Sequence, residues 1–277
     1  MTFGLLSDTH ADFYISVEST INQRRLSAMM DKYLKGISLD VLLMPGDIGH
    51  YNRQSIDFLK VILDHYDVGQ IVATIGNHEL YLLSKSARSN YVTSLRKIDS
   101  YKELLSNVPN VTLLDGDVTT VSGVRIGGTC GWYDDSYYRL LSPGPYSPDI
   151  HSLWRDYSND SLQIYPRLHY YETMSQEFDK VKSVLEQGVD IMLTHICPVS
   201  DPSIPDPKHK DDLSTTFYCF DGAHLIEKYS PKVWVYGHMH SPHSTTVHST
   251  ILARNPMGYP GELCTANSLY TFTLPGA

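Results

Sequence analysis

Side chains that bind divalent metals recur in five short clusters, and this ordered series constrains the fold more than any other feature. In chain order the clusters are Asp8-Thr9-His10, Gly46-Asp47, Gly76-Asn77-His78-Glu79, Thr194-His195 and Gly237-His238-Met239-His240. Two carboxylates, one amide and four or five imidazoles exceed what one ion can use. A dinuclear centre with one bridging carboxylate accommodates them, and such centres activate a water molecule for hydrolysis. The sequence therefore predicts that these distant segments converge on two metal ions.

The chain has 277 residues, and its ligand clusters extend from residue 8 to residue 240. Since one site needs parts from most of the chain, we expect a single catalytic domain over residues 1–277. Lys and Arg total 22 against 31 Asp and Glu, which gives a formal net charge of −9. This charge disfavours binding to extended nucleic acid or to an anionic membrane. It is compatible with a nucleotide, because two bound cations would reverse the local field.

The sequence shows neither an export signal nor a membrane span. The N-terminal residues lack a basic segment followed by a long apolar core, and no apolar run approaches about 20 residues. The cysteines, Cys130, Cys197, Cys219 and Cys264, form no CxxC pair. We therefore expect a cytoplasmic protein with reduced thiols. Cys197 lies two residues from His195 and could be a soft ligand, although a buried thiol is the commoner role.

A strand–helix–strand rhythm organises the first part of the chain. Short apolar runs at 3–6, 41–44 and 71–75 each lead into one of the first three clusters. Helical spacing of apolar residues at about 18–35 and 54–66 separates these runs. The pattern predicts a largely parallel sheet with the ligands in loops at the C-terminal ends of its strands.

The later part predicts a second sheet. Residues 111–114 and 119–129 read as paired strands with a turn near Ser122-Gly123, and strands at 190–194 and 233–236 lead into the last two clusters. Closing β segments are expected at 245–253 and 269–274, and a helix at about 170–187. Two packed sheets covered by helices account for this order.

An aromatic-rich insertion occupies about residues 132–171. It carries ten Trp or Tyr residues and is interrupted by four prolines. Long loops of this sort often form lids or binding surfaces. A packed, irregular excursion whose aromatic rings cover the edge of a sheet is the alternative, and both readings stay open.

The residue types indicate which ions the clusters suit. Asp8 and His10 alternate along an extended segment after a strand, so a local bend can turn both toward one ion. His238 and His240 repeat this spacing, and Gly237 permits close backbone approach. Mixed imidazole and carboxylate ligation suits Mn, Fe, Zn, Ni or Co.

The series D-x-H, GD, GNHE, H and GHxH resembles the calcineurin-like metallophosphoesterase superfamily over about residues 3–255. The resemblance implies an α/β fold: a four-layer αββα sandwich of two mixed sheets flanked by helices, with the dinuclear site at the strand C-terminal loops. It also implies two sets of metal ligands that share the bridging Asp47. The first set is Asp8, His10, Asp47 and His240, and the second is Asp47, Asn77, His195 and His238.

The resemblance implies that His78 faces the substrate as a catalytic residue and binds no metal. Two cations about 3.5–4 Å apart would present a bridging hydroxide to phosphorus. His78 would stabilise the phosphoryl group or protonate the leaving oxygen. Glu79 is expected to orient a ligand or a loop, with a helix N-terminal carboxylate as the alternative.

The substrate is less constrained by the motifs. Protein phosphatases of this superfamily extend the second motif as GD-x-x-DRG, whereas this chain has His50 and Tyr51 at the Asp and Arg positions and Leu80 after GNHE. His50 could contact substrate, but a solvent-facing or hydrogen-bonded side chain is favoured. Arg254, in an NP-x-GY context, could bind a phosphate or a carboxylate, or form a surface ion pair.

We therefore expect a metal-dependent phosphatase or phosphodiesterase that acts on a small phosphoester. A nucleotide is one candidate, since rings of the insertion could stack a base. The alternatives are a protein phosphatase, a nuclease and a non-catalytic interaction module with the same fold.

Overall fold

The computed structural model describes residues 1–14, 20–144, 149–166, 168–262 and 268–275. Within these residues, the strands form one sheet of five and one sheet of six. The first sheet has the order β11 (Tyr270–Thr273), β1 (Thr2–Leu5), β2 (Ser38–Pro45), β3 (Asp67–Thr74) and β4 (Val111–Leu114). The second has the order β5 (Asp117–Val121), β6 (Val124–Thr129), β7 (Ile191–Thr194), β8 (Val233–Val235), β10 (Thr250–Arg254) and β9 (His243–Val247).

Both sheets are mixed: the first is antiparallel at one edge only, and the second has a parallel centre and two antiparallel edges. Strands β1 to β4 pair in parallel, and β11 joins β1 in the antiparallel sense. In the second sheet β6, β7, β8 and β10 are parallel, while β5 and β9 close the two edges as hairpins. The parallel strands of each sheet therefore end on one side, where the ligand loops begin.

The described helices cover the outer faces of the sheets and the end above the strands. Those before residue 110 are α1 (Ala11–Tyr14), α2 (Thr20–Leu34), α3 (Asn52–His65), α4 (Asn77–Leu80), α5 (Lys85–Tyr91) and α6 (Ser94–Leu105). Those after it are α7 (Ser136–Leu141), α8 (Ile150–Tyr157), α9 (Asp160–Gln163), α10 (Tyr170–Glu186), the 3₁₀ helix η1 (Leu213–Tyr218) and α11 (Ala223–Tyr229).

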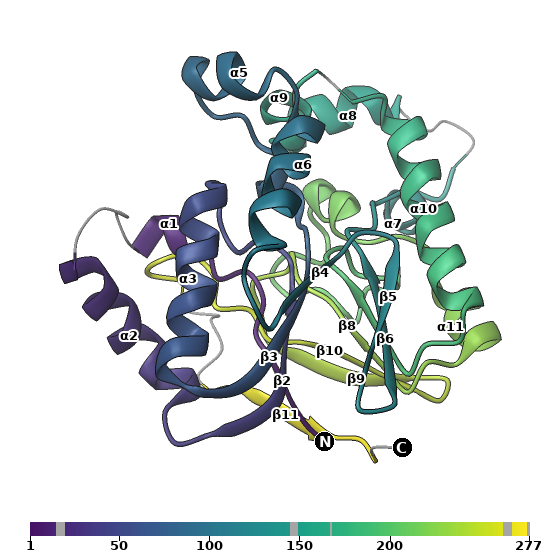
Figure 1. Cartoon of the computed structure of the whole chain (residues 1–277). Coiled ribbons are helices and arrows are strands. Elements are labelled where there is room, and N and C mark those ends of the chain that lie inside the picture. Colours follow the sequence, from purple (N-terminus) through teal and green to yellow (C-terminus); the bar gives the residue numbers. More distant parts are fainter. Residues whose placement is uncertain (15–19, 145–148, 167, 263–267, 276–277) are drawn as a thin grey trace.

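Figure 1 shows the predicted four layers: α2 and α3 lie outside the first sheet, the two sheets face each other, and α10 and α11 cover the second. The short helices of the insertion, α8 and α9, lie at the upper end of the sandwich beside α5 and α6. The expected α/β architecture is confirmed.

An aliphatic layer fills the space between the sheets. Alternate residues of each strand point into it, because side chains change face at every position of a strand. Its buried members include Phe3, Leu5, Val41, Leu43, Val72, Leu114, Val124, Ile126, Ile191, Leu193, Val233, Val235 and Ala253. The intervening residues, such as Leu42 and Trp234, pack against the helices. Burial on both faces explains why the central strands read as continuous apolar runs.

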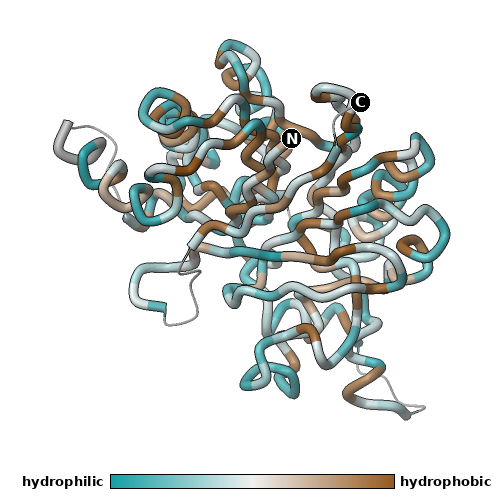
Figure 2. Tube along the Cα trace, turned by 90° about the horizontal axis from the view of Figure 1, so that it is seen from below, coloured by the Kyte–Doolittle hydropathy of each residue, from teal (hydrophilic) through white to brown (hydrophobic). Residues whose placement is uncertain are grey.

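Hydropathy follows the same arrangement. Figure 2 shows hydrophobic segments gathered along the interior strands, whereas the outer turns of the helices are mostly hydrophilic. In the described part of the chain, no helix has both the length and the apolarity required to cross a bilayer.

Two predictions about the strands need correction. The predicted pairing of residues 111–114 with 119–129 is wrong, because β4 pairs with β3 in the first sheet while β5 and β6 form a hairpin in the second. The turn near Ser122-Gly123 is correct, and both residues have positive φ. The closing segment at 245–253 is a hairpin of two strands, since the chain turns at His248 with φ 52°.

The insertion is more regular than the long loop or the irregular excursion expected from the sequence. It forms α7, α8 and α9 and the start of α10, with residues 145–148 and 167 outside the described part. Several of its rings are buried: Trp132, Tyr133, Tyr137, Tyr138, Trp154 and Tyr170. Tyr157, Tyr165 and Tyr171 remain exposed. Packing thus accounts for most of the aromatic residues.

Candidate metal centre

The loops that follow the strands adopt a backbone conformation that side chains other than glycine rarely take. Asp8, His10 and Asp47 have φ values of 49°, 40° and 55°, and His238 has 66°. This left-handed conformation costs free energy, and it is concentrated where side chains must be aimed. The extended segment predicted for Asp8 and His10 is therefore wrong in detail, since two left-handed residues produce the bend.

These bends bring the predicted ligands of the first set together. His10 Nε2 lies 3.1 Å from His240 Nε2 and 3.8 Å from Asp47 Oδ2. Asp8 Oδ1 lies 3.7 Å from His240 Nε2. Asp8 comes after β1, Asp47 after β2 and His240 after β8, so both sheets contribute to this group.

The second set converges on the other side of Asp47. His195 Nε2 lies 3.3 Å from Asp47 Oδ2 and 2.9 Å from Asn77 Oδ1. Asp47, His195 and His238 also offer ligand atoms within 4.8 Å of one another. All seven predicted residues are thus brought together, with Asp47 between two groups.

The charges in this cluster are buried without a lysine or arginine among its members. Burial raises the pKa of Asp8, and His240 and His195 only partly offset this. Burial alone would also raise the pKa of Asp47, but the facing His195 and His78 outweigh it and hold that pKa well below its ordinary value. Asp47 in turn raises the pKa of His195 to about 10 against the effect of burial. Buried carboxylates need cationic partners, and divalent ions would supply them.

Three of the four predicted histidine ligands are oriented as metal ligands usually are, whereas Nδ1 of His10 is buried and has no hydrogen-bond partner among the described residues. The outward nitrogens face protein acceptors: His195 Nδ1 lies 2.9 Å from Pro45 O, His240 Nδ1 lies 2.8 Å from Glu262 Oε2, and His238 Nε2 lies 3.1 Å from Phe217 O. Such contacts set the tautomer and leave the other nitrogen for the ion. The donor set therefore fits divalent cations.

Comparison with known proteins agrees with this geometry. The model of the calcineurin-like phosphoesterase family matches residues 1–242. The chain belongs to this family. It is accordingly a phosphoester hydrolase that depends on divalent metal ions.

Solved structures show similar folds at low sequence identity. Phosphopantetheinyl hydrolase from Mycobacterium tuberculosis aligns with a TM-score of 0.66 and 17% identity over 99% of this chain and 98% of that chain. A 5′-nucleotidase from Candida albicans aligns with a TM-score of 0.42 and 13% identity over 93% of this chain and 45% of that chain. A search among curated proteins finds no significant match.

Glu79 organises the ligand loops of this phosphoesterase. Its buried carboxylate accepts hydrogen bonds from the backbone N–H groups of Asp47 (3.0 Å), Ile48 (2.7 Å), Gly49 (3.1 Å) and Gly76 (2.6 Å). The bond from Gly76 also caps the N-terminus of α4. Both roles considered from the sequence are therefore present, and together they hold the second and third clusters side by side.

Two glycines of the motifs allow the loops to touch. A Cβ at Gly76 would lie 2.2 Å from Asp47 Oδ1, and a Cβ at Gly237 would lie 2.8 Å from Pro45 O and 2.9 Å from Asp8 Oδ2. Any side chain at these positions would displace a carboxylate of the cluster. The expected close approach at Gly237 is confirmed.

His78 lies at the edge of the cluster and lines the adjacent cavity. Its Nε2 is 3.2 Å from the hydroxyl of Tyr259 and 3.8 Å from Asp47 Oδ2. Burial lowers the pKa of His78 to about 4, with Asp47 opposing. The side chain is therefore a neutral imidazole at physiological pH.

His50 packs behind His78 with ring centroids 4.5 Å apart. Its Nδ1 is 2.5 Å from Asp12 Oδ2, and its backbone N–H donates to the other oxygen of Asp12. His50 is buried, so of the two expectations the hydrogen-bonded one is correct. Tyr51 is exposed, which removes it from the cluster.

Among the described residues Arg254 has no ion-pair partner, and it does not line the cavity. It is buried and donates to Ser241 O, Tyr236 OH and Ile204 O. In the described part of the chain its hydrogen-bond acceptors are neutral groups. It supports the loop that follows His240, and both roles considered from the sequence are wrong.

Cys197 is a buried thiol, as favoured from the sequence. Burial raises the pKa of Cys197 to about 11, and its Sγ donates to Val199 O at 3.5 Å. Cys264 lies outside the described residues.

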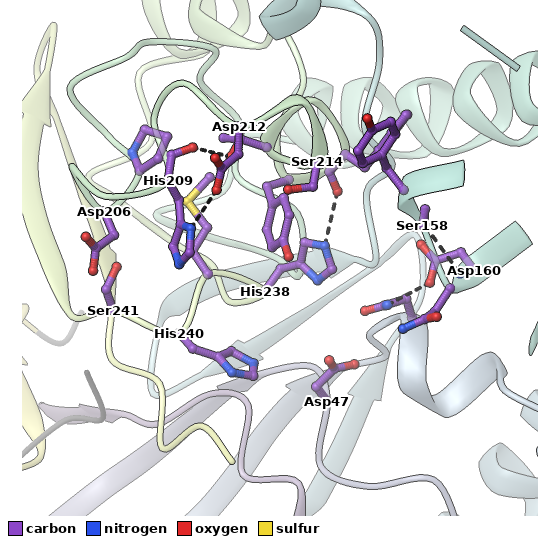
Figure 3. Close-up of a pocket in the computed structure, with 18 of the residues that line it drawn as sticks. Asp47, Ser158, Asp160, Asp206, His209, Asp212, Ser214, His238, His240 and Ser241 are labelled. Atoms are coloured by element: carbon purple, nitrogen blue, oxygen red, sulfur yellow. Dashed lines mark hydrogen bonds and ion pairs between the residues drawn. The ribbon is translucent and has the colours of Figure 1, made fainter. Parts of the chain in front are cut away.

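A cavity of about 550 Å³ opens beside the cluster. One wall comes from Tyr157 to Asp160 of the insertion, and the opposite wall from residues 205–218. Figure 3 shows Asp47, His238 and His240 at its base, with Asp160 on one side and Asp206 and His209 on the other.

Three residues near the cluster were missed from the sequence. Tyr259 stacks on His10 with centroids 4.3 Å apart, Glu262 accepts from His240, and Asp160 accepts from Asn77. The NP-x-GY segment was a signal for Tyr259 and its neighbour Glu262. Asp160 has no motif, since only the fold of the insertion brings it to Asn77.

Proposed function

We propose that the enzyme hydrolyses a small phosphodiester with an uncharged organic arm. Two divalent cations would be held by the two groups that share Asp47. The first group is Asp8, His10, Asp47 and His240, and the second is Asp47, Asn77, His195 and His238. The convergence of these donors without a lysine or arginine supports the assignment.

The cations, when bound, would lower the pKa of a water molecule and neutralise charge on the phosphoryl oxygens. Imidazole and carboxylate donors favour Mn, Fe, Zn, Ni or Co, and Mn²⁺ is the first choice for assay.

His78 would act as a neutral hydrogen-bond donor. Its lowered pKa means that an imidazolium is scarce at neutral pH, so stabilisation of a phosphoryl oxygen through Nε2–H is favoured over protonation of the leaving group. The hydroxyl of Tyr259 lies 3.2 Å from that nitrogen and would accept the same N–H until a phosphoryl oxygen replaces it.

The scarcity of positive side chains around the cavity is our reason for proposing a diester substrate. Among the described residues that line it, Lys208 is the one side chain with a permanent positive charge, and it pairs with Asp206 (3.6 Å). Asp160, Asp212 and Glu262 also line the cavity. A monoester dianion or a second phosphate would meet few cations beyond the metals, whereas a diester has one charge.

Two kinds of organic arm are candidates, one from the cavity wall and one from the fold. Tyr157 lies on the wall and is exposed, so it could stack a nucleobase, which makes cyclic nucleotides one candidate. The similar fold of a phosphopantetheinyl hydrolase makes a phosphopantetheinyl ester another.

We also propose that residues 1–277 act as one catalytic unit, because both sheets contribute to the cluster.

Cys130, Cys197 and Cys219 are free and buried. Buried thiols of this sort support our proposal that the protein works in the cytoplasm.

The test is an activity screen of the purified protein with Mn²⁺. We expect a higher kcat/KM for bis-nitrophenyl phosphate than for nitrophenyl phosphate, and slow turnover of nucleoside diphosphates. Cyclic nucleotides and phosphopantetheinyl esters would identify the arm. The variant Asp8→Asn controls for contaminating phosphatases.

Other outcomes would reject the proposal in distinct ways. Preference for a monoester or a phosphopeptide would indicate a phosphatase, and cleavage of plasmid or single-stranded DNA a nuclease. No turnover with any first-row metal would indicate a non-catalytic module.

A further inference from the structure

We propose that Asp160 is a positioning residue for the metal centre. It would orient the amide of Asn77 so that the carbonyl oxygen, and not the NH₂ group, faces the cluster. The inference rests on the proposed function, because it takes Asn77 as a metal ligand.

Asp160 is the first residue of α9, in the insertion, and it is 2% exposed. Its Oδ1 lies 2.8 Å from Asn77 Nδ2, which also lies 3.0 Å from the hydroxyl of Tyr81. Both hydrogens of the Asn77 amide are therefore used on the side away from the cluster. Asn77 Oδ1 then lies on the other side, near His195.

Only an acceptor without hydrogens can decide between the two orientations of an amide. Because Nδ1 of His195 faces Pro45 O, its Nε2 is left for the ion and does not hold Asn77 Oδ1 by donating a hydrogen bond. A tyrosine hydroxyl can either donate or accept. An ionised carboxylate can only accept. If the amide were reversed, its oxygen would face Asp160 and its N–H groups would face the cations.

Asp160 is itself held in place. It accepts from the hydroxyls of Tyr81 (2.5 Å) and Tyr133 (2.7 Å), and Tyr133 accepts from Trp154 Nε1 (2.5 Å). Figure 3 shows Asp160 on the cavity wall, with dashed lines to neighbouring side chains. The buried rings of the insertion thus fix a carboxylate at the metal centre, which gives the insertion a role beyond covering the fold.

Removing this orientation should weaken one of the two metals. In Asp160→Asn the new side chain can turn an NH₂ group toward Asn77, so the amide of Asn77 can reverse. Loss of such an outer contact typically lowers metal affinity by about 10–100-fold. The ion held by Asp8, His10 and His240 should bind as before.

The experiment is a titration of the metal-free protein with Mn²⁺ alone. Calorimetry measures the binding, and electron paramagnetic resonance distinguishes coupled from isolated Mn²⁺. We expect two ions in the wild type. Asp160→Asn should bind its second ion about 10–100-fold more weakly and show isolated Mn²⁺ at equal loading. Asp156→Asn, an exposed residue of the same segment, is the matched control and should bind as the wild type.

A double variant separates positioning from mere support of the fold. In Asn77→Asp, two carboxylates would face each other, so the second ion should bind weakly. Adding Asp160→Asn then supplies a donor, and affinity for the second ion should rise. A structural role would lower affinity in both backgrounds.

The inference is overturned if Asp160→Asn binds both ions like the wild type, or if the double variant binds the second ion no better than Asn77→Asp. Two ions in the wild type without phosphoester hydrolysis would reject the proposed reaction and leave the inference standing. Fewer than two ions in the wild type would reject both.

Discussion

The layer between the sheets and the loops above it are both buried, yet they differ in almost every other respect. The first is built from aliphatic side chains such as Leu5, Leu43 and Leu193 on regular strands. The second holds buried carboxylates and imidazoles, and Asp8 and Asp47 have positive φ. Each left-handed residue costs on the order of 1–3 kcal/mol.

The comparison of the inter-sheet layer with the ligand loops indicates which region stabilises the other. Apolar burial stabilises a fold roughly in proportion to its area, whereas buried, unpaired charge opposes folding. The inter-sheet layer therefore supplies the free energy that holds the ligand loops in a strained form. Substitutions in the two regions should consequently have separable effects.

The largest effect is expected for the ligands. Asp8→Asn or His240→Ala should reduce metal content and lower turnover by at least about 10³-fold, since the cations supply several kcal/mol of transition-state stabilisation. Metal analysis and kcat measure this. The metal-free Asp8→Asn protein should also melt at a higher temperature than the metal-free wild type, because a desolvated charge near Asp47 is removed. A lower melting temperature would contradict the comparison.

The next effect concerns His78, which lies between the ligand loops and the cavity. His78→Ala should keep both metals and lose about 10²–10³-fold in kcat, the usual loss for one hydrogen-bond donor in a site. Full activity on substrates with poor leaving groups would refute this role. His65→Ala, an exposed histidine at the end of α3, is the control.

The pH profile sharpens this prediction. The pKa of His78 is lowered to about 4, so the neutral form prevails above that pH and is lost below it. The contribution of His78, taken as the ratio of wild-type to variant kcat, should therefore stay constant from about pH 6 to 8. A ratio that falls as pH rises through this range would indicate an imidazolium acid.

The difference between the regions also explains what the sequence could predict. Strands with alternating or continuous apolar residues, such as Val41–Met44, can be predicted from the local pattern. Motif residues such as His238 likewise identify the loops that carry them. Pairing was harder: β4 and β5 are neighbours in sequence but enter different sheets, and local pattern does not record the switch.

Side chains that act through the fold left little local signal. Asp160 depends on how α8 and α9 pack, and Arg254 looked like an anion-binding residue because its burial under the loop after His240 arises from tertiary contacts. A local bend was expected at Asp8 and His10, but its left-handed conformation was not, because neither residue is a glycine.

A smaller effect is expected in the inter-sheet layer. Leu193→Ala should lower the free energy of unfolding by about 2–5 kcal/mol through lost burial and a cavity. Denaturant unfolding measures this, with Leu95→Ala, a 66% exposed leucine of α6, as the control. The folded variant should still bind metal normally, and a loss of metal affinity would show that the regions are not separable.

The smallest effect is expected at a surface network near both sheets. Lys180 Nζ and Lys102 Nζ each lie 2.7 Å from Asp115. Burial alone would raise the pKa of Asp115, but these lysines outweigh it and the pKa is lowered. Lys180→Met should cost about 1 kcal/mol or less, given solvent screening.

The sign of its pH dependence follows from the lowered pKa. Because folded Asp115 binds its proton more weakly than the unfolded chain, its stabilisation is full above about pH 4 and is lost as pH falls through the lowered value. The stability difference between Lys180→Met and the wild type should shrink in acid. Lys182→Met, on the same helix with a looser contact to Glu186, is the control.

The predicted ligands are drawn from both sheets, with Asp47 after β2 and His195 after β7. Within the described residues no strand ladder joins these sheets, and a single bridge between Ser7 and Pro256 connects their ends near the cluster. Bound cations would therefore add further connections between the two sheets. A ligand present at a hundred times its dissociation constant stabilises by about 2.7 kcal/mol. The melting temperature should then rise with the concentration of the ion. In a chelated sample, the contacts between the two sheets should open first.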